Sequence, residues 1–217
     1  MTLRLHRSGR FRAWLGARLD GDFALGDRVW RRVLHAICAG ALFYYLLPEG
    51  IFVVAPKDVV LVAALIAVLL LELLRHLAGL ELPTIRPYEH ERVASYAFFA
   101  VAIVVTILVF PEAIAAAVVL GTALVDPLVG EMRVARASPA VLWIVPILAY
   151  AALALVGLVV IGHWPLLDSL GLAALAAPIA VAVERPKTRW VDDDLAMTFV
   201  PAIALVVVAV LVLRLPG

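Results

Sequence analysis

Three neighbouring aspartates are the most conspicuous polar group in an otherwise apolar chain. Asp192, Asp193 and Asp194 stand directly before a long apolar run. One aspartate is enough to cap a helix N-terminus, and three adjacent carboxylates repel one another unless a cation lies near them. Mg²⁺ prefers oxygen ligands and commonly takes one or two carboxylates together with substrate phosphates. We therefore predict that Asp192 and Asp193 bind Mg²⁺.

Asp126 is the second candidate, inside or at the end of the apolar run VVLGTALVDPLVGEMR. A carboxylate at the centre of a bilayer costs about 2.5–3.5 kcal/mol, so Asp126 should face a polar cavity or a partner. Pro127 disfavours helical angles at the residue before it. With Gly121 and Gly130 nearby, we predict a broken helix whose free backbone groups and carboxylate suit a cation or phosphate. The alternative is a carboxylate that only caps a helix at the interface.

Other polar residues flank the apolar runs. The stretch RRVLHAICAG (31–40) places Arg32 and His35 three residues apart, on one helix face, where the pair could grip a phosphate. Flanking positive charge explains Arg31 and Arg32 equally well, but it does not explain His35, which lies within the apolar run. Glu184 closes the run AALAAPIAVAVE and either joins the aspartate cluster or marks the interface.

Two groups of charges also have a purely structural interpretation. The triple aspartate could form no more than a helix cap and a salt-bridged loop with the preceding cations Arg185, Lys187 and Arg189. Glu72 and Arg75 are three residues apart and share a helix face, where their charges neutralise each other. We expect the second group to be mainly structural.

Composition identifies the elements that must position these residues. The chain has 217 residues, of which 65% are hydrophobic, whereas a soluble domain is about 45–50% apolar. Several apolar stretches approach the roughly 20 residues needed to cross a bilayer as a helix, and the short alternating segments of a membrane β-barrel do not occur in the sequence. We therefore predict an all-α, polytopic membrane protein. Cys38 is the single cysteine, so an intramolecular disulfide is excluded.

We predict seven spans, with the N-terminus in the cytoplasm. In this topology 16 of the 18 lysines and arginines fall on the cytoplasmic side, as the positive-inside rule requires. Residues 1–28 would form a basic cytoplasmic or interfacial segment, and residues 29–217 a single membrane domain. The expected spans are residues 33–47, 58–78, 93–109, 113–130, 139–161, 169–183 and 195–213.

Known catalytic patterns are absent from the sequence. It has no GxxxxGK[ST] phosphate loop, no HExxH and no GxSxG. Aromatic residues are not interleaved with a basic surface, so we expect no nucleic-acid partner. The expected partners are the lipid bilayer and whatever substrate meets the polar residues at its cytoplasmic face.

In three motifs the chain resembles the polyprenol kinase family, which includes dolichol kinase, phytol kinase and the CTP-dependent diacylglycerol kinases and is related to the CDP-diacylglycerol synthases. RRVLHAICAG is similar to the family's basic pair, histidine and glycine at the first span. VDPLVG is similar to its mid-chain Gly-Asp motif, with Val125 in place of the glycine. Glu184 and DDDLAMTFVP are similar to its C-terminal motif, with Asp194 in place of an asparagine. The family's Lys-Thr/Ser-x-Glu-Gly segment is replaced by EMRVARASPAVLW.

This resemblance spans roughly residues 29–213 and implies a lipid kinase. Such an enzyme transfers the γ-phosphoryl group of a nucleoside triphosphate, typically CTP and otherwise ATP, to the hydroxyl of a membrane lipid alcohol. It implies that Asp126, Asp192 and Asp193 bind Mg²⁺ and nucleotide, and that Glu184 or His35 positions or deprotonates the lipid hydroxyl. The residues that would neutralise phosphate charge are Arg31, Arg32, Arg133, Arg136 and Lys187.

Three other functions remain open at this point. A CDP-lipid-forming cytidylyltransferase would use the same lipid site but move a nucleotidyl group. An ion-coupled transporter would use Asp126 as its ion site. An inactive family member would explain the replaced lysine-containing segment. In a cell without organelles, the expected location is the plasma membrane, with the site on its cytoplasmic side.

Overall fold

A computed structural model describes residues 23–48, 55–79, 92–185 and 192–213, and all regular structure within these ranges is helical. The predicted all-α class is thereby confirmed. The elements are α2 (Phe23–Ala39), η1 (Gly40–Leu42), α3 (Phe43–Leu46), α4 (Lys57–Ala78), α5 (Ser95–Val109), α6 (Glu112–Val134), α7 (Val141–Val156), η3 (Gly157–Ile161), α8 (Leu166–Glu184), α9 (Asp193–Val206) and η4 (Val207–Val212).

Within the described ranges, three helices are long and apolar enough to cross a bilayer: α6, α8 and the continuous segment Val141–Ile161 formed by α7 and η3. Shorter apolar helices cover Arg32–Leu46 and Ser95–Val109. At about 1.5 Å per residue, the 23 residues of α6 extend about 34 Å, slightly more than the hydrocarbon core of a bilayer. These helices fit the prediction of a membrane protein.

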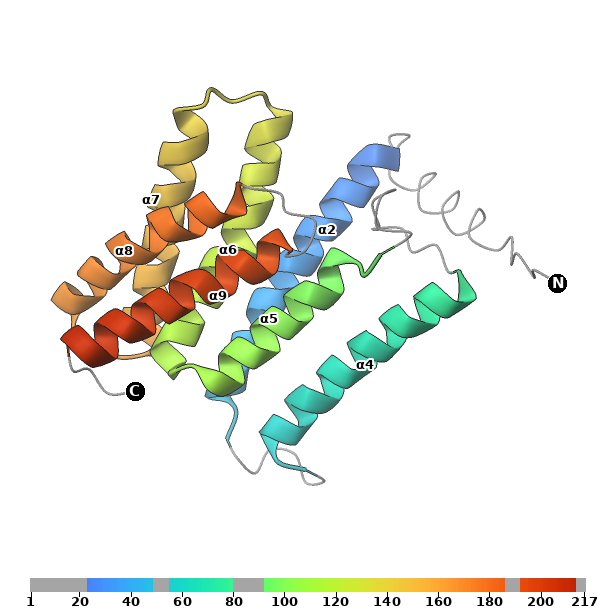
Figure 1. Cartoon of the computed structure of the whole chain (residues 1–217), viewed down its shortest axis with the longest axis horizontal. Coiled ribbons are helices and arrows are strands. Elements are labelled where there is room, and N and C mark those ends of the chain that lie inside the picture. Colours follow the sequence, from blue (N-terminus) through green and yellow to red (C-terminus); the bar gives the residue numbers. More distant parts are fainter. Residues whose placement is uncertain (1–22, 49–54, 80–91, 186–191, 214–217) are drawn as a thin grey trace.

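Helix α6 is the central element of the bundle and packs against α2, α5, α7 and α9 (Figure 1). Its interior positions are mostly small, and they are fully buried. Small residues allow helices to approach closely in a membrane, where packing rather than the hydrophobic effect drives helix association. The fully buried alanines of α6 are Ala115, Ala116, Ala117 and Ala123.

Large apolar side chains lie on the outside of the bundle instead. Helix α4, which packs against α5, exposes leucines along much of its length, among them Leu70, Leu74 and Leu77. Leu148 of α7 and Leu167 of α8 are likewise exposed. Small residues inside and large apolar residues outside are the distribution expected where lipid rather than water surrounds the bundle.

The helix passes through Pro127 without a break, so the broken span predicted at Asp126 is wrong. Pro127 cannot donate to the carbonyl of residue 123, but neighbouring helices hold α6 on several sides. Helix-breaking residues are tolerated in membrane helices because the surroundings satisfy the freed backbone groups. Pro146, Pro178 and Pro201 also lie inside helices.

Polar contacts join the ends of neighbouring helices at both ends of the bundle. At one end Arg133 near the end of α6 pairs with Glu184 at the end of α8, and Ser95 at the start of α5 bonds to Asp192 at the start of α9. At the other end Tyr44 of α3 donates to Asp58 at the start of α4. The first end carries the predicted functional residues.

Close packing of η3 against α6 predicts a large effect of adding one methyl group. A Cβ on Gly157 would lie 2.6 Å from Cα of Ala117, which is backbone that cannot move aside. We expect Gly157→Ala to lower the free energy of unfolding by about 1–3 kcal/mol. Thermal unfolding in detergent would measure this change.

Gly171→Ala is the matched control, because a Cβ on Gly171 of α8 meets no atom within 4 Å. This substitution should raise stability by about 0.5–1 kcal/mol, through the lower conformational entropy of the unfolded chain. Equal effects of the two substitutions would contradict the close packing of η3 on α6.

Candidate metal and phosphate site

The three motifs, distant in sequence, meet at one end of the bundle. His35 of α2 lies with its Nδ1 3.9 Å from Oδ2 of Asp126 on α6. The ligand atoms of His35, Asp126 and Asp194 all lie within 4.8 Å of one another. His35 and Asp194 are buried, at 7% and 4% exposure. Residues from the beginning, middle and end of the chain therefore form a single polar cluster.

Asp126 is shared with a second group of possible ligands. One oxygen each from Asp126, Glu184 and Asp193 lie within the same 4.8 Å, and so do the carboxylates at 192–194. The group of Asp126, Glu184 and Asp193 offers only carboxylate oxygens, the donor set that suits Mg²⁺. The group with His35 adds an imidazole, which suits a transition metal better. The residues present thus fit the predicted magnesium ion.

Asp192 has a structural role at the start of α9. Its Oδ1 accepts a hydrogen bond from the backbone N–H of Asp194 at 3.1 Å, as in an N-cap. Its Oδ2 accepts one from Oγ of Ser95 at 3.2 Å. Asp192 therefore caps the helix and also belongs to the group formed with Asp193 and Asp194, while Asp193 belongs to the group formed with Asp126 and Glu184 as well.

Sequence reasoning missed Asp194 as a site residue. On α9 it shares the buried face with Met197, Thr198 and Pro201, at spacings of three, four and seven residues. That spacing was visible in the sequence and could have placed the third aspartate, rather than the first, toward the interior. Ser95 was also missed, and no sequence pattern distinguishes it.

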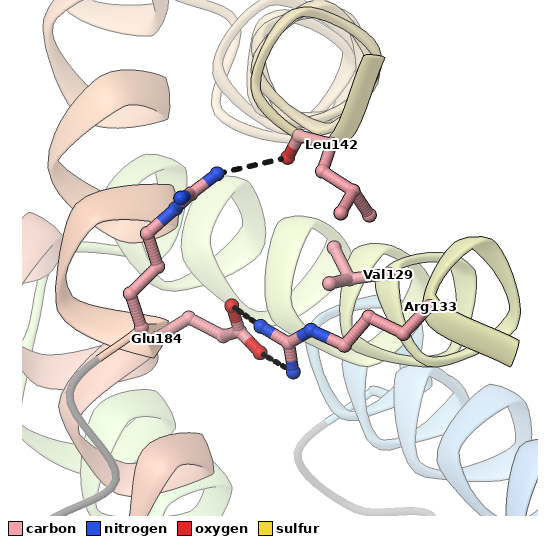
Figure 2. A pocket seen from close by; sticks show the side chains of 5 residues that line it. Val129, Arg133, Leu142 and Glu184 are labelled. Carbon is pink, nitrogen blue, oxygen red and sulfur yellow. Dashed lines mark hydrogen bonds and ion pairs between the residues drawn. The ribbon is translucent and has the colours of Figure 1, made fainter. Parts of the chain in front are cut away.

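Arg133 and Glu184 form a two-pronged ion pair (Figure 2). Both nitrogen–oxygen distances are 2.7 Å, from Nη1 to Oε1 and from Nη2 to Oε2. Glu184 is 2% exposed, whereas the Arg133 side chain is 38% exposed. The Nη2–Oε2 contact is a hydrogen bond and the Nη1–Oε1 contact an ion pair, so one predicted phosphate ligand is held by one predicted catalytic carboxylate.

A pocket of about 220 Å³ adjoins this ion pair, lined by Val129, Arg133, Leu142, Glu184 and Arg185. Nη2 of Arg185 donates to the carbonyl of Leu142 at 3.5 Å. Pro146, four residues later, has no N–H with which to bond that carbonyl. The Arg185 guanidinium also stacks over the Trp143 ring, 3.5 Å from its centroid. Arg185 thus lies where a phosphate group entering the pocket would meet it.

The other predicted phosphate-binding cations differ in their partners and exposure. Arg32 forms an ion pair with Glu131 of α6, and both side chains are partly exposed. Arg136 follows α6 in an exposed position with a φ of 54°. Arg31 belongs to α2 but its side chain lies outside the described part of the chain, as does the whole of Lys187. Of the predicted phosphate ligands whose side chains are described, Arg133 contacts the cluster directly, through Glu184.

Two threonine hydroxyls join α6 to α9 one turn away from the aspartates. Oγ1 of Thr122 donates to the carbonyl of Met197 at 3.2 Å, which Pro201 leaves without its helical donor. Oγ1 of Thr198 lies 3.3 Å from Oγ1 of Thr122 and donates to the carbonyl of Asp194 at 2.7 Å. Because Thr122 precedes Asp126 by four residues, these bonds hold Asp126 and Asp194 opposite each other.

Replacing Thr122 by valine should therefore destabilise the protein. The change leaves the buried carbonyl of Met197 without its donor, which costs about 1–3 kcal/mol. We expect a lower midpoint of thermal unfolding in detergent, together with weaker Mn²⁺ binding, because Asp126 and Asp194 lose their link.

Thr106→Val provides the control on the neighbouring helix α5. The hydroxyl of Thr106 is buried and makes no hydrogen bond with any residue that the structure describes. Its removal should leave stability unchanged or raise it. A loss equal to that of Thr122→Val would show that the hydrogen bonds of Thr122 contribute nothing specific.

The chain shows no significant match to any protein-family model, curated protein or solved structure. The comparisons therefore identify no family for the chain.

Proposed function

We propose that the protein is an integral-membrane lipid kinase that transfers the γ-phosphoryl group of a nucleoside triphosphate, CTP or ATP, to the hydroxyl of a membrane lipid alcohol. One observation carries this proposal: His35, Asp126, Glu184 and the aspartates at the start of α9 form one cluster at one end of an apolar bundle. Such a position suits a reaction between a water-soluble nucleotide and a lipid.

The proposed topology has seven spans, with the N-terminus and the cluster in the cytoplasm. The apolar ranges of the sequence coincide with helices, and the arginines near the cluster satisfy the positive-inside rule on that side. Nucleoside triphosphates and Mg²⁺ are available there. The tail of the lipid alcohol would remain among the exposed apolar side chains of the bundle.

In the proposed reaction Asp126, Asp193 and Glu184 would hold Mg²⁺. When bound, the ion would supply positive charge for the transferring phosphoryl group, which is the main demand of this chemistry. The lipid hydroxyl oxygen forms the new bond to the γ-phosphorus while the bond from that phosphorus to the β–γ bridging oxygen breaks, and the nucleoside diphosphate leaves. His35 accepts the hydroxyl proton. Its ring is stacked on Phe99 with centroids 4.6 Å apart and lies beside Asp126, which orients it.

Arg133 changes partner in this mechanism. Its guanidinium pairs with both carboxylate oxygens of Glu184. A phosphate group competes with that carboxylate because two of its oxygens can accept from both prongs of the guanidinium, and it carries more charge. Nucleotide entering the pocket beside Arg133 and Arg185 would thus release Glu184 toward Asp126 and Asp193. Nucleotide and metal should then bind cooperatively.

The decisive experiment uses the full chain in lipid, with Mg²⁺, γ-labelled CTP or ATP and a panel of lipid alcohols. Label in a lipid monophosphate, together with nucleoside diphosphate, supports the kinase and identifies both substrates. A CDP-lipid and pyrophosphate would instead establish nucleotidyl transfer. Ion flux across sealed vesicles without nucleotide turnover would establish a transporter with Asp126 at its ion site.

A further inference from the structure

A buried ion pair on α4 is not used by the proposed reaction. Glu72 and Arg75 are 6% and 2% exposed. Nε of Arg75 donates to Oε2 of Glu72 at 2.8 Å, and its Nη2 donates to Oε1 at 2.7 Å. Burying two charges carries a desolvation penalty, and a well-packed apolar pair often stabilises a fold as well or better. The pair therefore calls for an explanation beyond packing α4 against α5.

The same two side chains hold the start of α5. Oε1 of Glu72 accepts the backbone N–H of Ala94 at 2.8 Å. Its Oε2 accepts the hydroxyl of Tyr96 at 2.5 Å. Nη2 of Arg75 donates to the carbonyl of Arg92 at 2.7 Å. Glu72 thus fixes the residues immediately before and after position 95.

Ser95, between these two fixed residues, is the link to the cluster. Its Oγ donates to Oδ2 of Asp192 at 3.2 Å, and Asp192 caps the first turn of α9 through the N–H of Asp194. The chain of contacts therefore runs from Glu72 through Ser95 and Asp192 to Asp193 and Asp194.

We infer that Glu72 is a positioning residue for the metal-binding aspartates, acting through Ser95 on the cap of α9. This inference rests on the proposed function only where it assigns a metal to those aspartates. The contacts that orient metal ligands commonly change metal affinity by 10–100-fold when they are removed. Glu72 lies on α4, at the edge of the bundle (Figure 1), and would act on these ligands indirectly, through Ser95 and Asp192.

Mn²⁺ binding to the full-length protein in detergent, followed by electron paramagnetic resonance, tests the inference. Glu72→Gln retains the size of the side chain, but its single amide oxygen cannot accept from both the Ala94 N–H and the Tyr96 hydroxyl. We expect its dissociation constant for Mn²⁺ to rise about 10-fold. Ser95→Ala should cause a similar rise, and the double variant should show little further loss, because both changes interrupt one chain of contacts.

Asp58→Asn is the matched control, since it replaces a carboxylate by an amide at the opposite end of the same helix, where Asp58 accepts from Tyr44. It should leave Mn²⁺ affinity unchanged. An equal loss of affinity in Asp58→Asn, or unchanged affinity in Glu72→Gln, would overturn the inference and leave Glu72 with a role in stability alone.

Hydrogen exchange in the metal-free protein separates this inference from the proposed function. If the unsubstituted protein binds no Mn²⁺, the proposed metal site is disproved. Hydrogen exchange still tests whether Glu72 positions the start of α9. Faster exchange of the Asp194 amide in Glu72→Gln and Ser95→Ala, and not in Asp58→Asn, would support it. Unchanged exchange in all three variants would refute it.

Discussion

Asp126→Asn is expected to lower phosphoryl transfer to the lipid alcohol at least about 100-fold. Loss of a residue that merely orients a metal ligand costs 10–100-fold, and Asp126 belongs to both groups of possible ligands that include His35 or Glu184. The amide keeps the size of the side chain but removes the charge that would bind the cation and orient His35. Initial rates at saturating Mg²⁺ and nucleotide measure the effect.

Glu112→Gln is the control for Asp126→Asn on the same helix. Glu112 begins α6, 14 residues before Asp126, which is about 21 Å along the axis. The control should keep full activity. If Asp126→Asn retained activity while folding normally, the cluster would not be the catalytic site.

Arg133→Ala is expected to lower the free energy of unfolding by about 2 kcal/mol. Removing one partner of a fully buried ion pair costs about 3–5 kcal/mol, because the other charge is left uncompensated. Glu184 is buried, but the Arg133 side chain is 38% exposed, so solvent screens part of the interaction and the expected loss is smaller. Unfolding in a detergent titration, followed by circular dichroism, would measure the loss.

Two further variants test the cause of this loss. Glu184→Gln combined with Arg133→Ala should recover part of the stability, since no buried carboxylate then remains unpaired. Arg136→Ala removes an exposed arginine three residues away and should change stability by less than about 0.5 kcal/mol. Strictly additive losses in the double variant would contradict the coupling of Arg133 with Glu184.

The same variants separate a role in stability from a role in nucleotide binding. Under the proposed function, Arg133→Ala also weakens nucleotide affinity, because the variant lacks the guanidinium that would bind the phosphates. In the absence of nucleotide, however, it frees Glu184 and should strengthen Mn²⁺ binding. A variant that only unfolds the bundle would weaken both.

Helix positions were predictable from the sequence because apolar length is a local property. The ranges 58–78 and 93–109 agree closely with α4 and α5. The largest differences arise where tertiary packing opposes local preference. Pro127 has no N–H and disfavours helical angles at the residue before it, so it favours a helix break. Helix α6 nevertheless continues through it, because neighbouring helices surround that turn. A separate difference is the start of α2 at Phe23, well before residue 33, where the first span was expected to begin.

Partner choice at the site was not predictable from residue types. Arg133 was expected to hold a phosphate, and Glu184 or His35 to act on the lipid hydroxyl; that Arg133 and Glu184, 51 residues apart, bind each other was not expected. Asp192 was expected to bind metal, and its bond to Ser95, 97 residues away, was not expected. Such pairs depend on which helix ends meet, and a linear pattern carries no information on that.

The sequence by itself determined that this chain is helical and apolar, and that its carboxylates and cations occur in a few short stretches beside the apolar runs. These properties follow from composition and from spacing along one helix. Only the tertiary structure decided that His35, Asp126, Glu184, Asp193 and Asp194 share one cluster. It also decided that Glu72 bonds on both sides of Ser95. The reason is physical: distances between side chains on different helices are set by packing around the small residues of α6, which no single stretch of sequence specifies.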